Sequence, residues 1–201
     1  ARHAIEPGAV DLVGMTRAHF ADPHLVAKLK RGEAGRIRTC VGASLCINRL
    51  HLGLDSVCIQ NPATGREGTV SQLVARSAGP RRRVVVVGGG PGGLEAARTA
   101  AERGHAVVLF EAQDRLGGQL SLMARAGERQ REVSGLVDWL VDEVALVGVD
   151  IRLSTPVDVS DVLAEGPDVV IVATGGTPEV SYMEMGADLV STAWDVLGGS
   201  V

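Results

Sequence analysis

Three cysteines lie close together in the stretches CVGASLC and DSVC. Cys40, Cys46 and Cys58 give the spacing C-x5-C-x11-C. A zinc finger takes two close pairs of ligands, so this spacing is not typical of zinc. Cysteines with short gaps suit an iron–sulfur cluster, in which the thiolates converge from one loop, but such clusters ordinarily use four. The three residues are therefore candidate iron ligands with one ligand unaccounted for.

A second group that could do chemistry is a run of glycines directly after the apolar segment VVVV. It reads G-x-G-x-x-G and lies between a predicted strand and a predicted helix. The first glycine allows a tight turn, the second lets the backbone approach a pyrophosphate, and the third lets helix and strand pack closely. The helix N-terminus offers free N–H groups to the phosphates. The residues expected at this dinucleotide site are Gly88, Gly90, Pro91, Gly92 and Gly93.

An acidic residue follows the glycines at the spacing that a dinucleotide site requires. Glu111 ends the predicted strand HAVVLFEA, eighteen residues after Gly93, and Ala112 comes next. A carboxylate there accepts hydrogen bonds from ribose hydroxyls, and it would repel a 2′-phosphate, which disfavours NADP. An unliganded glycine turn and an ordinary exposed acid are the alternatives to this interpretation.

The elements needed to position these residues alternate between strands and helices from residue 84 onward. Such alternation predicts an α/β fold with a Rossmann-like parallel sheet and right-handed crossovers. Before it, residues 10–17 are expected to form a short buried strand, and 71–83 a linker. The later segments are strands at 84–87, 105–112, 149–155 and 167–176, and helices at 92–104, 128–148 and 159–166.

Composition narrows the function classes. A net charge of −4 argues against a nucleic-acid partner, because that binding depends on neutralising phosphates. Apolar runs stay far below the ~18 residues of a membrane span. Three cysteines, an odd number, do not make a disulfide framework, so we expect a cytoplasmic protein. The chain opens without Met, which suggests a piece of a longer polypeptide, and no catalytic acid or base stands out.

The segment VVIVATGG resembles the two-dinucleotide-binding-domain flavoproteins of the glutathione reductase type. In those proteins the first glycine motif binds the ADP part of FAD, and an A-T-G after a later strand closes over the same nucleotide. The resemblance implies that Val157 lies beside the adenine. It also places near the cofactor the residues Ala173, Thr174, Gly175 and Gly176.

The segments around the cysteines, GRIRTCVGASLCINRL and VCIQNPATGRE, resemble the trimethylamine dehydrogenase and 2,4-dienoyl-CoA reductase family of Old Yellow Enzyme-like flavoproteins. That family holds a 4Fe–4S cluster in a loop with four cysteines. Cys40, Cys46 and Cys58 match its first, third and fourth ligands, whereas Ala43 stands where the second would be. Either three cysteines bind a cluster with an outside ligand or water, or the cluster is lost and the thiols are free.

The same resemblance extends to both sides of the loop. VDLVGMTRAHFADPHL is similar to the last strand and helix of the family's (β/α)8 barrel, where Arg17 would hold the FMN phosphate of a full-length parent. DRLGGQL also matches, which implies that Gly118 and Gln119 line the FAD or ADP site. The implied domains are an incomplete barrel end (1–39), a cysteine loop (40–70), a linker (71–83) and an FAD- or ADP-binding domain (84–201), without the NAD(P)H domain.

The resemblance implies a fragment of a flavin-dependent oxidoreductase. Its parent would oxidise an amine or reduce an enoyl compound at FMN, and would pass electrons through a 4Fe–4S cluster to the FAD or ADP domain, with NAD(P)H as a partner. The isolated chain is expected to be inactive. A structural ADP- or FAD-binding module without a redox role is the alternative, and a zinc-stabilised interaction domain is a third. Oligomeric state is left open.

Overall fold

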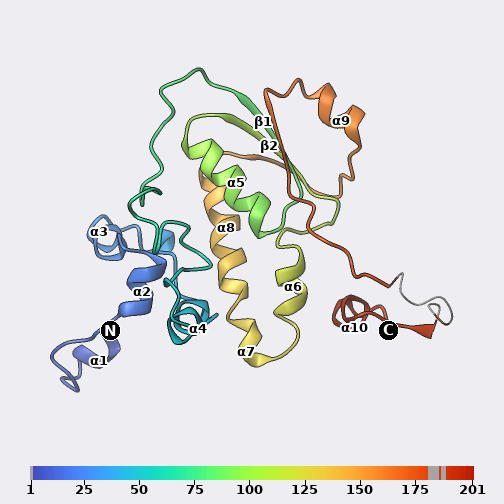
Figure 1. Cartoon of the computed structure of the whole chain (residues 1–201). Coiled ribbons are helices and arrows are strands. Elements are labelled where there is room, and N and C mark those ends of the chain that lie inside the picture. Colours follow the sequence, from blue (N-terminus) through green and yellow to red (C-terminus); the bar gives the residue numbers. More distant parts are fainter. Residues whose placement is uncertain (1, 181–185, 187–188) are drawn as a thin grey trace. The chain divides into compact units, whose positions relative to one another are not determined.

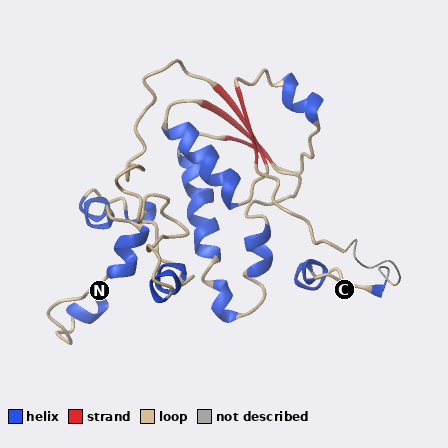
Figure 2. Ribbon diagram, in the orientation of Figure 1, coloured by secondary structure: helices blue, strands red, loops and turns tan. Residues whose placement is uncertain are grey.

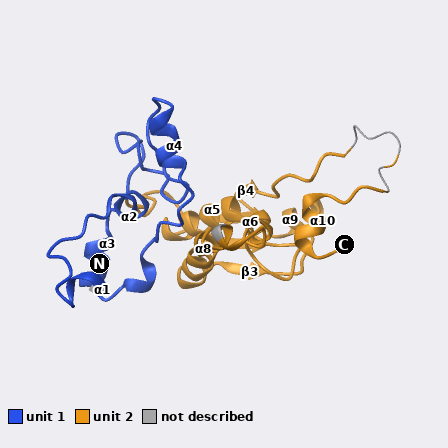
Figure 3. Ribbon diagram, turned by 90° about the horizontal axis from the view of Figure 1, so that it is seen from below, with its two compact units in different colours: residues 1–72 blue, residues 73–201 orange. Residues whose placement is uncertain are grey.

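The computed structural model describes residues 2–180, 186 and 189–201. The chain divides into two compact units, residues 1–72 and 73–201, which Figure 3 colours separately. The division falls inside the segment 71–83 that we expected to be a linker. None of the helices in the described part has both the length and the apolar character that a membrane span needs.

The second unit is built on a parallel sheet of four strands in the order β3-β2-β1-β4. The strands are β1 (Arg83–Val87), β2 (Ala106–Phe110), β3 (Asp150–Arg152) and β4 (Val169–Val172). Val85 pairs with Val108 on one side and with Val170 on the other. This confirms the predicted Rossmann-like α/β fold, with all four strands of the unit near their predicted positions.

Helices cover both faces of this sheet (Figures 1 and 2). On one face α5 (Pro91–Glu102) packs against β1, β2 and α8 (Ser134–Leu146). On the other face α9 (Val159–Ala164) places Val162 against Val85, Val108 and Phe110. Alternate residues of a strand face opposite sides, so the apolar run of β1 serves both layers. The Val84–Val86 segment is therefore almost completely buried.

The region predicted as one helix over 128–148 is two helices, α7 (Glu128–Arg131) and α8. At Val133 and in the first turn of α8, the backbone N–H groups of Val133, Gly135 and Leu136 bond to carbonyls three residues back, which tightens the chain locally. A further helix, α6 (Gln119–Met123), begins directly after the GG pair, where only a loop was expected. The chain's last helix is α10 (Ala193–Gly198).

The first unit is helical and irregular. Its helices are α1 (Arg2–Ile5), α2 (Thr16–Ala21), α3 (Leu25–Lys30), the 3₁₀ turn η1 (Ala34–Arg36) and α4 (Leu45–His51). The predicted buried strand at 10–17 is wrong, because residues 10–15 adopt no strand and Leu12 is 88% exposed. A strand needs a neighbour for its backbone hydrogen bonds, and no strand occurs among the described residues of this unit.

A buried carboxylate organises the approach to the cysteines. Asp22 is 3% exposed and accepts hydrogen bonds from the Lys28 ammonium (2.6 Å) and from the backbone N–H groups of His24 and Arg38 (both 3.0 Å). Burial alone would raise the pKa of Asp22, but these donors outweigh it and hold the pKa below its usual value. Arg38 lies two residues before Cys40, so this carboxylate fixes where the cysteine segment begins.

We expect Gly93→Ala to destabilise the second unit by about 2–3 kcal/mol, as overpacking does. A Cβ on Gly93 would lie 1.9 Å from the backbone oxygen of Gly88, which cannot move aside. Gly92→Ala is the matched control, because a Cβ there meets nothing within 4 Å. Both tryptophans, Trp139 and Trp194, lie in this unit, so urea unfolding followed by their fluorescence measures the effect. Equal midpoints for the two variants would contradict the close-packing role.

Asp22→Asn should loosen the segment that leads to the cysteines. Hydrogen bonds to a charged group contribute ~1.5–3 kcal/mol, so amides within residues 22–40 should exchange about tenfold to a hundredfold faster at pH 7. Because the folded pKa lies below the unfolded value of ~3.9, the wild-type contribution is complete above that pH and is lost as pH falls through the folded pKa.

Hydrogen exchange measured by mass spectrometry checks this Asp22 prediction. Glu33→Gln is the control, because the pair of Glu33 with Arg31 (2.7 Å) is largely exposed and its loss should leave exchange in residues 22–40 nearly unchanged. If Asp22→Asn exchanged like the control at pH 7, the organising role of this carboxylate would be refuted.

Candidate functional site

The glycine turn between β1 and α5 brings three backbone segments into close contact. Gly88 has φ +106° and donates its N–H to the carbonyl of Phe110 at 2.8 Å. A Cβ on Gly88 would lie 2.4 Å from the carbonyl oxygen of Ala173, beyond the end of β4. Gly93 approaches Gly88 just as closely from the first turn of α5. Two of the three motif glycines are thus required by the packing of the protein itself.

The third motif glycine differs from these two. A Cβ on Gly90 would meet no atom within 4 Å, and its φ of −72° is open to any residue. Gly92, in the first turn of the twelve-residue helix α5, also faces open space. The space beside this helix N-terminus, where free N–H groups attract anions, is therefore open at Gly90 and Gly92.

Glu111 lies directly after β2 and beside the same turn. Its side chain is 8% exposed, and its Oε2 accepts the N–H of Gly89 at 2.6 Å while Oε1 accepts the N–H of Gln113 at 2.8 Å. Each carboxylate oxygen can accept a second hydrogen bond, so both remain able to receive ribose hydroxyls. The adjacent Ala112 is exposed.

The GG pair before α6 connects the turn to the segment after β4. Gly117 donates its N–H to the carbonyl of Gly89 at 2.9 Å, and a Cβ on Gly118 would lie 3.1 Å from Gly90 Cα. Gln119 Nε2 donates to the carbonyl of Gly176 at 2.9 Å. Gly118 and Gln119, predicted only from a family resemblance, therefore lie where the glycine turn and the end of β4 meet.

The segment after β4 is the last of the backbone segments that meet at the glycine turn. Ala173 donates its N–H to the carbonyl of Val87 at 2.8 Å and so continues the pairing of β4 with β1. Thr174, Gly175 and Gly176 then leave the sheet and are exposed. Val157 is half-buried against the core cluster below α9, just after the chain passes the carbonyl of Glu111.

Arg17 is the one predicted cofactor residue that lies outside the second unit. It is exposed on α2, in residues 1–72. A wider cavity of ≈ 490 Å³ opens between residues 114–121 and α8, with Asp138 and Asp142 in its wall. The glycine turn does not line this cavity, because Leu116 separates the two.

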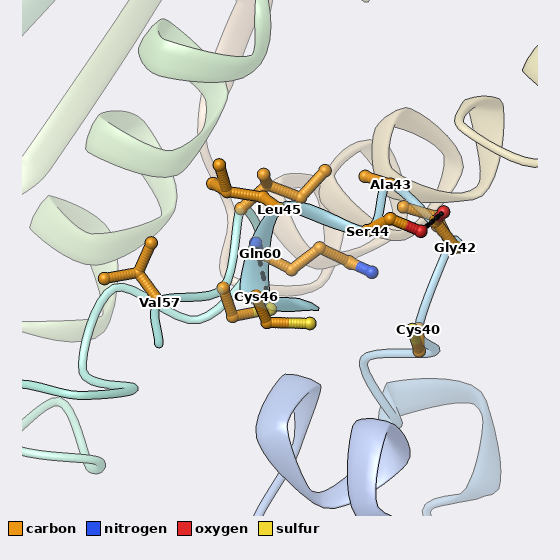
Figure 4. Close-up of a pocket in the computed structure, with 11 residues that line it drawn as sticks. Cys40, Gly42, Ala43, Ser44, Leu45, Cys46, Val57 and Gln60 are labelled. Carbon is orange, nitrogen blue, oxygen red and sulfur yellow. Dashed lines mark hydrogen bonds between the residues drawn. The ribbon is translucent and has the colours of Figure 1, made fainter. Parts of the chain in front are cut away.

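The three cysteines line a single small pocket in the first unit (Figure 4). The pocket has a volume of ≈ 30 Å³, and Cys40, Cys46, Cys58 and Ala43 all contribute to its wall. All three thiols are half-buried and free of disulfide bonds. The structure thus brings together the three predicted ligands and also the position where a fourth cysteine would be expected.

Local structure holds the cysteines in this arrangement. Cys46 lies in α4, a helix that the sequence did not predict, and its carbonyl accepts the hydroxyl of Ser56 at 3.2 Å. Ser44 precedes the helix in the left-handed conformation, with φ 58°, which is a strained choice for a residue with a Cβ. Cys58 Sγ accepts the N–H of Gln60 at 3.4 Å. The pocket wall is therefore built from ordered backbone on both sides.

The donor set fits soft metal chemistry. Thiolates bind iron–sulfur clusters, zinc and copper(I). Among the described residues, no three His, Cys, Asp or Glu side chains are arranged to hold one metal ion. A cluster makes no such demand, since each thiolate binds a different iron. The buried amide of Gln60, which also lines the pocket, was missed by sequence reasoning because no motif distinguishes it.

Comparison with known proteins shows which enzymes the chain is similar to. Residues 83–162 match the family described as FAD dependent oxidoreductase. The chain is 52% identical to an N,N-dimethylglycine/sarcosine dehydrogenase of Chromohalobacter salexigens, over 100% of this chain and 30% of that protein. It is 48% identical to a probable N-methylproline demethylase of Rhizobium meliloti, over 99% of this chain and 29% of that protein.

A solved structure is similar over almost the same extent. The 2-naphthoyl-CoA reductase complex superposes with a TM-score of 0.91 at 31% identity, over 99% of this chain and 30% of that one. The chain thus spans about 30% of the length of the relatives that it matches. Over this part of their length it resembles the trimethylamine dehydrogenase and 2,4-dienoyl-CoA reductase family of Old Yellow Enzyme-like flavin-dependent oxidoreductases.

Proposed function

We propose that the second unit binds the ADP portion of FAD, or ADP itself, at the glycine turn. The observation that carries this proposal is the contrast among the motif glycines. Gly88 and Gly93 are needed for internal packing, whereas Gly90 faces open space at a helix N-terminus and no contact within the protein requires it to be glycine. A ligand that approaches the backbone too closely for a side chain would explain why position 90 is glycine.

Each part of the site has a distinct task in this proposal. The N–H groups at the start of α5 bind the pyrophosphate, and Glu111 receives the ribose hydroxyls while repelling a 2′-phosphate. Gly118, Gln119 and the exposed Thr174–Gly176 segment border the nucleotide, and Val157 lies near the adenine. FAD, when bound, supplies one- and two-electron transfer; the residues of this chain bind it and orient it.

The cysteine pocket is proposed to hold an iron–sulfur cluster through Cys40, Cys46 and Cys58. Support comes from the convergence of three half-buried thiols on one pocket. A cluster there would transfer single electrons. Free thiols persist in a reducing compartment, so we place the protein in the cytoplasm.

For the full-length protein we propose oxidation of a small amine, or reduction of an enoyl compound, at FMN. The dehydrogenase and demethylase relatives named above support an amine, and the 2-naphthoyl-CoA reductase supports a conjugated acyl compound. Arg17 would hold the FMN phosphate there as a bidentate cation. NAD(P)H is the proposed partner, and the substrate contacts would come from elements other than residues 1–201.

A second candidate function is a nucleotide-binding module without a redox role. It is favoured by the hydrogen bonds of Glu111, whose two carboxylate oxygens already accept the backbone N–H groups of Gly89 and Gln113. A bound ADP would extend this network and stabilise the turn without exchanging electrons. Extraction of the nucleotide separates the candidates: a yellow protein that releases FAD supports electron transfer, and a colourless one that releases ADP supports the module.

Gly90→Ala should weaken ADP binding at least about tenfold, or about 1.4 kcal/mol, because the added methyl group occupies the path of the pyrophosphate. The unfolding midpoint should not fall, since the methyl group meets no protein atom. Titration calorimetry with ADP measures the affinity. Gly79→Ala, where a Cβ meets only Ser77 Oγ at 3.6 Å, is the control and should bind ADP like wild type. Unchanged affinity for Gly90→Ala would refute the proposed pyrophosphate position.

Anaerobic reconstitution with ferrous iron and sulfide should load the wild-type chain with iron. Cys46→Ser should retain less than half as much, because a hydroxyl is a poor iron ligand. Iron and labile sulfide are counted per chain after gel filtration, and dithionite should bleach the broad visible absorption. If the chain retained no iron but bound zinc, and zinc protected all three thiols equally from modification, the pocket would instead be a structural metal site.

A further inference from the structure

Gln60 combines burial with an unsatisfied polar atom at the cysteine pocket. It is 7% exposed, and among the described residues its Oε1 has no hydrogen-bond partner. Leaving a buried polar group unpaired costs about 1–3 kcal/mol, so such groups are rare in folded proteins. The oxygen is therefore available to accept a hydrogen bond or to bind a ligand.

The Gln60 side chain is held in place from several sides. Its backbone N–H donates to Cys58 Sγ at 3.4 Å, its backbone carbonyl accepts the Arg38 guanidinium, and its Nε2 donates to the carbonyl of Thr39, the residue before Cys40. A carbonyl needs a donor, so this last bond fixes which end of the amide is oxygen. Gln60 thus joins the segments that carry two of the three thiols.

The Gln60 side chain forms part of the pocket wall. In Figure 4 it extends from the side of Cys46 toward the Gly42–Ser44 segment. Gln60, Ala43 and all three cysteines line the same pocket. Ala43 offers only a methyl group, so the described wall of the pocket contains three sulfur donors and one orphaned carbonyl oxygen.

We propose that Gln60 Oε1 is the fourth ligand of the cluster and takes the place of the thiolate that Ala43 cannot supply. This inference rests on the iron–sulfur site proposed above. Clusters accept ligands other than thiolate: in Rieske centres two histidines replace two cysteines, and the reduction potential rises. An amide oxygen is neutral, whereas a thiolate carries a full negative charge. The cluster of this chain should therefore have a higher potential than one bound by four thiolates.

Two substitutions at Gln60 separate the oxygen from its neighbours. After anaerobic reconstitution of the 201-residue chain with ferrous iron and sulfide, wild type should hold about four irons and Gln60→Leu about three, because one corner loses its ligand. Gln60→Glu should keep about four, since a carboxylate oxygen occupies the same place. Both variants lose the N–H donor to Thr39, so their difference isolates the oxygen.

Restoring the thiolate gives an independent test. Ala43→Cys in the Gln60→Leu background should bring the iron content back to about four, because a cysteine at position 43 makes the amide unnecessary. Ala43→Cys alone should lower the reduction potential of the cluster relative to wild type. The potential is measured by a redox titration in which electron paramagnetic resonance reports the reduced cluster. Circular dichroism of the iron-free proteins shows whether each variant folds.

The outcomes distinguish the inference from the site on which it rests. If wild type and Gln60→Leu bind the same amount of iron at the same potential, Gln60 is no ligand, although the cluster site stands. Three irons in both proteins would lead to the same conclusion. If neither wild type nor Ala43→Cys retains iron, the iron–sulfur site is wrong and the role of Gln60 falls with it.

Discussion

The second unit depends on how closely three pieces of backbone meet at Gly88. The end of β2 arrives through the carbonyl of Phe110, the end of β4 through Ala173, and the first turn of α5 through Gly93. A single Cβ at Gly88 or Gly93 would keep these segments apart, because each would meet a backbone oxygen within 2.4 Å. Because these strands end together, the N-terminus of α5 and the Glu111 carboxylate lie side by side. The backbone packing at Gly88 therefore sets the geometry of the candidate site.

Local sequence patterns were sufficient to find most of this unit. The spacing from Gly88 to Gly93 predicts a turn from steric needs alone, and the run VVIVATGG predicts the strand that pairs with β1. Even so, the division of the predicted 128–148 helix was not foreseen, because it depends on hydrogen bonds to carbonyls three residues back around Val133. The spacing of hydrophobic residues predicts which face of a helix is buried, but it carries almost no information about such a local change in hydrogen bonding.

The first unit shows where sequence reasoning stops for physical reasons. Residues 10–17 have the composition of a buried strand, but a strand exists only if another strand accepts its hydrogen bonds, and composition cannot supply one. The organising role of Asp22 is equally invisible in the sequence, because its donors come from Lys28 and from Arg38, sixteen residues away. The cysteines were found because a cysteine is a candidate metal ligand by residue type alone, whatever the surrounding fold.

Gln60 shows how the two kinds of information combine. From sequence, Ala43 is a defect: one thiolate is missing from a loop that otherwise matches a cluster site. From structure, the Gln60 oxygen is a second irregularity: among the described residues, it is a buried acceptor without a donor. Ala43 and Gln60 both line one pocket. A cluster held there by three cysteines would lack one donor atom, and the Gln60 oxygen has an electron pair to donate. The mixed sulfur and oxygen ligation that we propose would satisfy both.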